Sequence, residues 1–187
     1  MRIIGGQFRG LHLSAIGKGD AAAHLRPTSD RVRESIFNLL LNGGYGNPVA
    51  GANVLDLFAG TGALGLEALS RGAAKVVFVD DGAKARALIA RNIDLCRAAD
   101  RASLLRRDAT RLGVASDGPF DLVFLDPPYG KGLGARALAS ARDGGWLADD
   151  ALVVWEENAQ QDLPEGFTLL DARRYGDSWI HVLGFAG

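Results

Sequence analysis

The chain contains few of the residues that build disulfide frameworks and metal sites. Its 187 residues include one cysteine and three histidines. Because Cys96 is the only cysteine, the chain cannot form an internal disulfide or a multi-cysteine zinc site. His12, His24 and His181 do not have the spacing of metal ligands. We therefore expect no metal in this protein.

Long apolar runs are also missing. No stretch approaches the roughly 20 consecutive apolar residues that a membrane-spanning helix requires. Residues 1–7 are too short an apolar stretch for a secretory signal. Hydrophobic residues nonetheless make up 48% of the chain, which is enough for one domain with a sizeable core. These features predict a cytoplasmic protein that does not bind a membrane.

A strong net charge is the third feature that the sequence lacks. Its 21 lysines and arginines nearly balance 22 aspartates and glutamates, so the formal net charge is −1. Such a protein has no overall electrostatic attraction to nucleic acid. Residues 1–33 differ from the rest because basic side chains outnumber acidic ones, namely Arg2, Arg9, Lys18, Arg26, Arg31 and Arg33 against Asp20 and Asp30. They predict either a basic N-terminal surface or scattered solvated charges.

The chain is expected to form one domain over residues 1–187, with an N-terminal extension. Residues 1–25 predict a β-hairpin, because apolar residues alternate loosely there and glycines interrupt them. Residues 27–30 offer capping side chains ahead of a helix with apolar residues at helical spacing. The string Asn42-Gly43-Gly44 ends that helix.

Residues 26–187 predict an α/β, Rossmann-like core. Short apolar strands alternate with helices, at 54–57, 76–79, 103–107, 122–125 and 152–155 for strands and at 63–71, 83–98 and 133–143 for helices. Such continuous apolar runs suit parallel strands that are covered on both faces. The last segments, 167–174 and 179–185, predict an antiparallel hairpin. A mostly parallel sheet with a final antiparallel hairpin is typical of methyltransferases rather than dehydrogenases.

A glycine-rich string follows the first predicted parallel strand. Gly60, Gly62 and Gly65 match G-x-G-x-x-G, in which glycines let the backbone approach a ligand closely. Asp80 lies 20 residues after Gly60, at the end of the next strand, where an acid binds ribose hydroxyls. These demands are the same for NAD and for S-adenosylmethionine, so the motif by itself leaves both cofactors open.

Other residues favour S-adenosylmethionine. Asp56 precedes the glycines, where an acid can meet the cationic methionine end of that cofactor, and Asp108 follows the third strand, where it can contact the adenine amino group. An NAD-dependent oxidoreductase would instead carry Tyr-x-x-x-Lys or a His/Asp pair after the fourth strand. The predicted cofactor-binding residues are Asp56, Phe58, Ala59, Gly60, Thr61, Gly62, Asp80, Asp108 and Ala109.

The fourth strand leads into Asp126-Pro127-Pro128-Tyr129. Ligands of open α/β sheets lie beyond the carboxyl ends of the strands, so this loop should face the same crevice as the glycines. The prolines fix the backbone and leave carbonyl acceptors. The Asp126 carboxylate and the Pro127 carbonyl can together accept both hydrogens of an amino group and stabilise the charge that develops during nitrogen attack on a methyl donor. Tyr129 can stack on a flipped base. We expect Asp126, Pro127 and Tyr129 to be catalytic.

The sequence resembles the bacterial RsmD-like family, which methylates the N2 of a guanine in small-subunit (16S) ribosomal RNA. The resemblance covers nearly the whole chain and rests on residues 2–10, 25–34, 56–72, 126–129, 145–147 and 175–176. It implies a class I methyltransferase with strand order 3-2-1-4-5-7-6 and S-adenosylmethionine as cofactor, converted to S-adenosylhomocysteine. Two departures concern the adenosine contacts: Asp80 stands where the family more often has glutamate, and Gly82 stands at a position that is often acidic.

The resemblance also implies a substrate and a partner. The N-terminal extension would hold RNA phosphates beside the target base, with Arg26, Arg31, Arg33 and Pro128 at the substrate mouth. The expected partner is ribosomal RNA within the small subunit or its assembly intermediate, bound by a monomer. Two alternatives stay open: the same chemistry on adenine or cytosine of RNA or DNA, and a non-catalytic RNA-binding or ribosome-assembly module.

Overall fold

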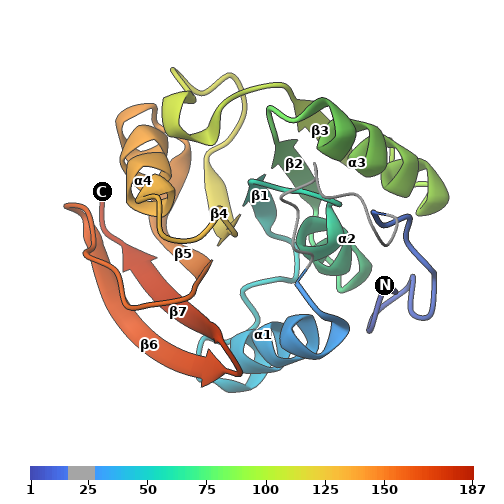
Figure 1. The fold of residues 1–187 in the computed structure, drawn as a ribbon, viewed down its shortest axis with the longest axis horizontal. Coiled ribbons are helices and arrows are strands. Elements are labelled where there is room, and N and C mark those ends of the chain that lie inside the picture. Colours follow the sequence, from blue (N-terminus) through green and yellow to red (C-terminus); the bar gives the residue numbers. More distant parts are fainter. Residues whose placement is uncertain (17–27) are drawn as a thin grey trace.

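The computed structural model describes residues 1–16 and 28–187. Within these residues, seven strands form one sheet in the order β3-β2-β1-β4-β5-β7-β6 (Figure 1). The strands are β1 (Asn53–Leu57), β2 (Lys75–Val79), β3 (Ala102–Leu105), β4 (Phe120–Leu125), β5 (Leu147–Glu157), β6 (Phe167–Tyr175) and β7 (Ser178–Phe185). β1 to β5 are parallel, and β7 runs antiparallel to both β5 and β6. The predicted α/β, Rossmann-like fold with its C-terminal hairpin is confirmed.

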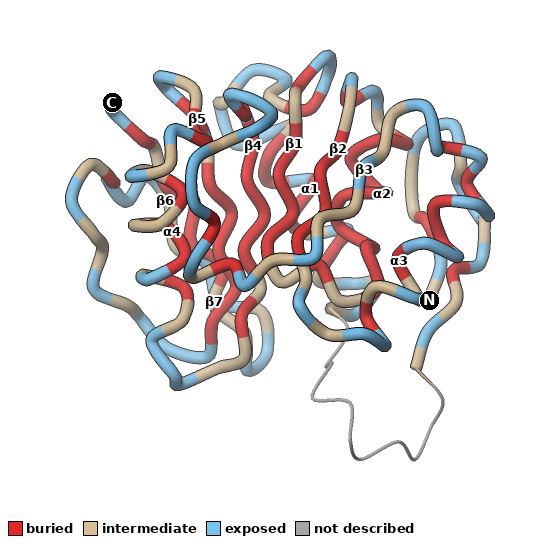
Figure 2. Tube along the Cα trace, turned by 90° about the horizontal axis from the view of Figure 1, so that it is seen from above, coloured by how far each residue is buried: buried red, intermediate tan, exposed pale blue. Residues whose placement is uncertain are grey.

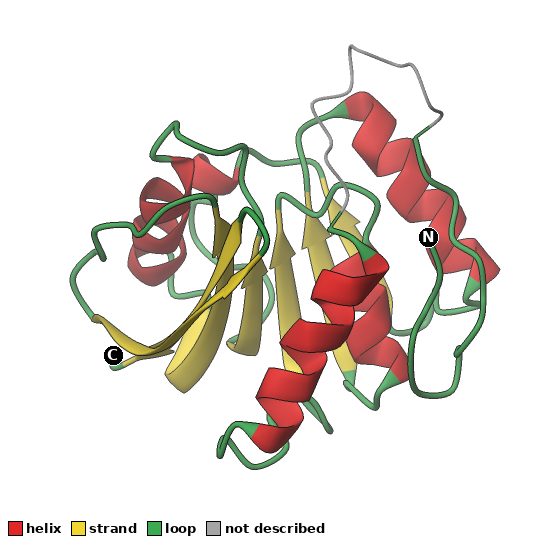
Figure 3. Cartoon of the chain, turned by 60° about the horizontal axis from the view of Figure 1, so that its bottom comes forward, coloured by secondary structure: helices red, strands yellow, loops and turns green. Residues whose placement is uncertain are grey.

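Helices cover both faces of the sheet (Figure 3). The helices α1 (Asp30–Asn42), α2 (Ala63–Ser70) and α3 (Ala83–Leu95) pack on one face. The opposite face carries α4 (Leu133–Asp143) and the short 3-10 turn η1 (Ala109–Arg111). Since both faces are covered, the central strands are buried along their length, whereas the loops at the rim are exposed (Figure 2).

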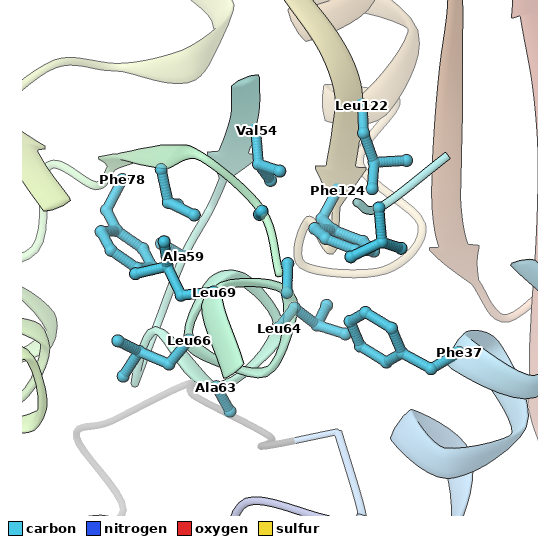
Figure 4. Packing of buried hydrophobic residues seen from close by; sticks show 14 of the residues in the cluster. Phe37, Val54, Ala59, Ala63, Leu64, Leu66, Leu69, Phe78, Leu122 and Phe124 are labelled. Atoms are coloured by element: carbon cyan, nitrogen blue, oxygen red, sulfur yellow. The ribbon is translucent and has the colours of Figure 1, made fainter. Parts of the chain in front are cut away.

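Alternate residues of each central strand belong to different halves of the core. Val54 and Phe124 lie in the cluster under α1, α2 and α3, whereas Leu55 and Leu125 lie in the cluster under α4. In Figure 4, Phe37 of α1 approaches Phe124 of β4, and the two ring centroids are 5.6 Å apart. This packing fixes α1 against the middle of the sheet and thereby places the residues just before α1 at the carboxyl end of β4.

The N-terminal segment, residues 1–16, pairs with itself and docks on α2 and α3. The Ile3 N–H donates to the Leu11 carbonyl at 2.9 Å, and Arg2 and His12 form an isolated antiparallel bridge. Within residues 1–16, the expected β-hairpin is therefore present only as this short pairing rather than as two strands; residues 17–25 of the predicted extension lie outside the described residues. Its turn follows α2 closely, because a Cβ on Gly6 would lie 1.8 Å from the Ser70 carbonyl oxygen.

Two buried polar side chains hold the N-terminal segment in place. Glu67 of α2 accepts the backbone N–H groups of Ile4 and Gly5 at 2.9 and 2.8 Å. Asn92 of α3 accepts the Ser14 N–H at 2.7 Å, and its amide donates to the carbonyls of Ser14 and Thr61 at 3.0 and 2.8 Å. Asn92 thus connects the N-terminal segment to the glycine-rich turn after β1.

Across the part of the chain that the structure describes, no helix has both the length and the apolarity needed to cross a membrane.

Candidate active site

A cavity of about 780 Å³ opens at the carboxyl ends of β1, β2 and β4. Its volume lies within the range of about 300–1,000 Å³ that is typical of small-molecule and cofactor sites. The turn after β1, the turn after β2 and the loop after β4 all contribute to its wall. The predicted site residues in this wall are Asp56, Phe58, Ala59, Gly60, Thr61, Asp80, Asp126, Pro127, Pro128 and Tyr129.

The turn after β1 owes its shape to residues in the left-handed backbone region. Gly60 and Gly62 have φ angles of 60° and 77°, which glycine adopts without steric cost. Phe58 has a φ of 56°, a strained conformation that in non-glycine residues often accompanies function. Gly62 does not line the cavity; its N–H donates to the Ala59 carbonyl at 2.7 Å and closes the turn.

Asp56 projects from the end of β1 into the cavity wall and is only 2% exposed. One of its oxygens accepts the Gly65 N–H at 2.9 Å. Burial raises the pKa of Asp56 to about 8, the Gly65 hydrogen bond opposes this shift, and the nearby Asp80 charge adds to it. Asp56 can therefore take up or release a proton near neutral pH, depending on what occupies the cavity.

Asp80, at the end of β2, is held by the backbone of both neighbouring turns. One oxygen accepts the Gly60 N–H at 3.0 Å, and the other accepts the Gly82 N–H at 2.8 Å. Burial raises the pKa of Asp80, although these two hydrogen bonds oppose the shift. A carboxylate has about four acceptor positions, so Asp80 can still accept hydrogen bonds from a diol in the cavity.

The loop after β4 is fixed by hydroxyl and carboxyl groups of β5 and β7. The Tyr129 phenol donates to Oε1 of Glu156 at 2.8 Å and lies 3.2 Å from the Ser178 hydroxyl. Ser178 also donates to Oε1 of Glu156 at 2.8 Å. The Tyr129 ring is consequently held at the cavity wall by its hydroxyl end.

Asp126 and Glu156 are connected by a single hydroxyl group. Oγ1 of Thr28, just before α1, lies 3.0 Å from Oδ2 of Asp126 and 3.0 Å from Oε2 of Glu156. Burial and the Glu156 charge raise the pKa of Asp126 well above its ordinary value, while the hydrogen bond that Thr28 donates to the ionised form of Asp126 opposes the shift. In residues 1–16 and 28–187, no group of three or more His, Cys, Asp and Glu side chains is arranged to hold a metal ion.

The sequence did not predict Thr28, Glu156 or Ser178 as residues of the site. Thr28 lies within the string that carried the family resemblance, but Glu156 is the residue before the last of β5 and Ser178 lies in the final hairpin. A signal for Glu156 was present, because an acid at the carboxyl end of the strand beside β4 faces the same edge of the sheet as Asp126.

Several predicted residues lie outside the cavity wall. Asp108 is exposed, and its carboxylate caps η1 by accepting the N–H and hydroxyl of Thr110 at 2.8 and 2.7 Å; these bonds lower its pKa. Ala109 is the first residue of η1 and is buried in the cluster on the α4 face. Neither residue lines the cavity, so the predicted adenine contact of this pair has no support in the observed wall.

The arginines expected at the substrate mouth differ in position. Arg33 is fully buried, and its guanidinium donates to the carbonyls of Thr28 and Arg2 and pairs with Asp30. A buried guanidinium cannot hold RNA phosphates, so the prediction for Arg33 is wrong; the residue ties α1 to the N-terminal segment. Arg31 is exposed on the first turn of α1. Arg26 lies outside the described residues.

Comparisons with known proteins identify the family of this chain. A family described as Conserved hypothetical protein 95 matches residues 1–184. The chain is 40% identical over 165 residues to Ribosomal RNA small subunit methyltransferase D of Escherichia coli (strain K12), covering 88% of this chain and 78% of that protein. It is 38% identical over 168 residues to Putative rRNA methyltransferase YlbH of Bacillus subtilis (strain 168), covering 88% and 86%.

A solved structure of a related protein shows the same similarity at the level of the fold. The putative methyltransferase yhhF from Escherichia coli superimposes with a TM-score of 0.82 and 34% sequence identity, covering 100% of this chain and 98% of that one. The similarity thus extends over the N-terminal segment, the glycine-rich turn, the loop after β4 and the C-terminal hairpin together.

Proposed function

The chain belongs to the RsmD family of ribosomal RNA methyltransferases, and on that premise we propose that it transfers a methyl group from S-adenosylmethionine to the N2 amino group of a guanine in small-subunit ribosomal RNA. One observation carries the proposal: the glycine-rich turn and the Asp126–Tyr129 loop border the same cavity. One wall is suited to a cationic nucleoside cofactor and the other to an amino group, as methyl transfer to a base requires.

The acids of the cavity fit S-adenosylmethionine. Asp56 is buried in the wall beside the glycine-rich turn, where a cationic amino acid end would favour its ionised form. Asp80 presents a carboxylate that the amides of Gly60 and Gly82 hold in place for ribose hydroxyls. When bound, the cofactor supplies a methyl group on a positively charged sulfur.

The loop after β4 would hold the target base. The Asp126 carboxyl and the Pro127 carbonyl accept the two hydrogens of the amino group, so that its nitrogen lone pair points at the methyl group. Tyr129 stacks on the base, and its phenol cannot swing away because Glu156 and Ser178 hold it. Stacking of this kind contributes about 1–3 kcal/mol per base.

The proposed partner is ribosomal RNA in the small subunit or its assembly intermediate, acted on in the cytoplasm by a monomer. A net charge of −1 provides little general attraction to RNA. Exposed Arg2, Arg9 and Arg31 lie on or beside the N-terminal segment and could contact RNA phosphates. We expect a ribonucleoprotein surface to supply the remaining recognition, so protein-free RNA should be the poorer substrate.

The test is methyl transfer from labelled S-adenosylmethionine to small subunits, stripped ribosomal RNA and DNA that lack the modification, followed by nucleoside analysis. Label in N2-methylguanosine of small subunits supports the proposal. Label in methyladenine or methylcytosine would replace the substrate but keep the chemistry. Absence of label in every nucleic acid would contradict the proposal and favour a non-catalytic RNA-binding module.

The Asp126→Ala variant tests the role of the loop. Removing an acceptor that acts in the transition state should lower turnover by about 10²–10³-fold. The affinity for S-adenosylhomocysteine should remain, because Asp56 and Asp80 are unchanged. Asp100→Ala, in an exposed turn after α3, is the matched surface control and should retain full turnover. Wild-type turnover in Asp126→Ala would refute the role assigned to this residue.

A further inference from the structure

The hydroxyl group of Thr28 has one hydrogen but two carboxyl neighbours. Oδ2 of Asp126 and Oε2 of Glu156 each lie 3.0 Å from Oγ1. The hydroxyl can donate to only one of these oxygens. The other contact is a favourable hydrogen bond only if that oxygen donates to Thr28, and a carboxyl oxygen donates only when it carries a proton. The two contacts of 3.0 Å at one hydroxyl group therefore favour a state with one proton on the Asp126–Glu156 pair.

The hydrogen bonds on Glu156 indicate which carboxyl group carries that proton. Oε1 of Glu156 accepts from the hydroxyls of Tyr129 and Ser178, both at 2.8 Å. These two donors occupy both lone-pair positions of that oxygen. Asp126 has only the Thr28 hydroxyl as a side-chain partner in the described residues, and burial together with the Glu156 charge raises its pKa. With the proton on Asp126, this carboxyl group donates to Thr28, and Thr28 in turn donates to Glu156.

We propose that Thr28 and Glu156 form a proton relay with Asp126 that receives the proton lost by the target amino group. The relay rests on the methyltransferase function proposed above. As the nitrogen–methyl bond forms, the carbon–sulfur bond breaks and its electron pair stays on sulfur. The nitrogen then releases one proton to Oδ1 of Asp126. The proton on Oδ2 of Asp126 moves to Oγ1 of Thr28, and the hydroxyl proton of Thr28 moves to Oε2 of Glu156.

The charges of the site agree with this sequence of steps. Before transfer, the carboxyl pair carries one negative charge, opposite to the single positive charge of a sulfonium. After transfer, the sulfur is neutral, and the pair is neutral because it has gained one proton. No net charge is therefore created in a buried site, where an unpaired charge is costly. Glu156 returns its proton to solvent after the product leaves.

The relay gives Asp126 a function that it cannot have alone. A protonated carboxyl group can accept a hydrogen bond at its free oxygen, but it is a weak base. Transfer of its own proton to Glu156 in the same step makes it able to accept another. Other titratable groups facing the pair are Asp56 on β1, Glu157 on β5 and Tyr129 in the loop, and Lys131 lines the same cavity. They affect the pair through charge, but among residues 1–16 and 28–187 only Thr28 hydrogen-bonds to both of its members.

The kinetic test compares Thr28→Val, which removes the hydroxyl from a side chain of the same shape, with Thr28→Ser, which retains it. With small subunits as substrate, Thr28→Val should lose about 10²-fold in kcat at pH 7 with little change in KM, whereas Thr28→Ser should remain near wild type. Raising the pH should restore the activity of Thr28→Val, because ionised Asp126 then takes the proton directly. Unchanged kcat in Thr28→Val, or a loss that pH does not restore, would overturn the relay; the second outcome indicates positioning alone.

A second measurement does not depend on activity. The infrared C=O stretching band of a protonated carboxylic acid can be followed in the free protein, and subtracting the spectrum of Asp126→Asn isolates the contribution of Asp126. We expect this band at pH 7 in the wild type, with a titration midpoint that falls to lower pH in Glu156→Gln. If the wild type lacks the band, the relay is wrong even when methyl transfer is observed. If the band behaves as expected but no RNA is methylated, the proposed function fails while the shared proton is confirmed.

Discussion

Ionisation of Asp56 should make cofactor binding depend strongly on pH. The carboxyl group is 2% exposed and has a pKa of about 8 because of burial. A bound ligand with a cationic amino group favours the ionised form, so binding releases a proton wherever Asp56 is protonated beforehand. From pH 6 to pH 8 the ionised fraction rises by about 50-fold, and the affinity for S-adenosylhomocysteine should increase by the same factor.

The variant Asp56→Asn isolates this effect. An asparagine oxygen can still accept the Gly65 N–H, so the local hydrogen bond is preserved. The affinity of the variant should stay nearly constant from pH 6 to pH 8 and fall below that of the wild type at pH 8. Isothermal titration calorimetry in two buffers of different ionisation enthalpy gives both the affinity and the number of protons released. Asp100→Asn is the control and should follow the wild type.

Stability in the absence of ligand gives an independent check with a defined sign. The pKa of Asp56 is raised from 3.8 in the unfolded chain to about 8 in the folded protein. The stability contributed by the protonated group is complete below pH 3.8, falls by about 1.4 kcal/mol per pH unit above that, and is fully lost once the pH has risen through about 8. Asp56→Asn should remove this slope from urea unfolding. If the variant keeps the wild-type pH dependence in both binding and unfolding, Asp56 is not the titrating group.

Two glycines give further predictions about packing. In Gly6→Ala, the new Cβ would lie 1.8 Å from the Ser70 carbonyl oxygen, so the N-terminal segment should detach, with a lower melting temperature and faster proteolysis within residues 1–16. Gly10→Ala is the matched control, because Gly10 has a similar positive φ but no atom lies within 4 Å of the position of the added Cβ. An equal fall in melting temperature in Gly10→Ala would mean that backbone strain, not the clash, is responsible. In Gly65→Ala, the Cβ would lie 2.4 Å from Cε1 of Phe78, so urea unfolding should show a loss of about 1–3 kcal/mol, and no loss would contradict the close packing of α2 on β2.

The fold follows from the sequence because its strands are buried on both faces. Runs such as Val76–Val79 contain no polar residue that would face solvent, and they therefore predict parallel strands between two layers of helices. The glycine-rich turn and the Asp126–Tyr129 loop were predicted to share a crevice because both follow parallel strands, and both do line one cavity.

Other features depended on contacts that no local pattern contains. The Thr28 and Glu156 side chains meet although 128 positions separate them in the chain. The polar helix turn around Arg33 predicts an exposed cation, but the docking of the N-terminal segment buries this side chain. Asp108 follows β3 at the expected point, yet its carboxylate is directed to the N–H of Thr110, because capping a 3-10 turn is a local alternative that aspartate favours.

The N-terminal segment has a structural role in the site as well as a proposed one in RNA binding. Asn92 joins Ser14 to the Thr61 carbonyl, and therefore joins the segment to the turn that borders the proposed cofactor site. Arg33 binds the carbonyls of Arg2 and Thr28, so the segment also supports the residue whose hydroxyl connects Asp126 with Glu156. Detaching the segment should consequently weaken both walls of the cavity at once. A truncated protein that lacks residues 1–16 would then lose affinity for S-adenosylhomocysteine as well as for RNA, whereas a segment that served only as an RNA arm would affect RNA alone.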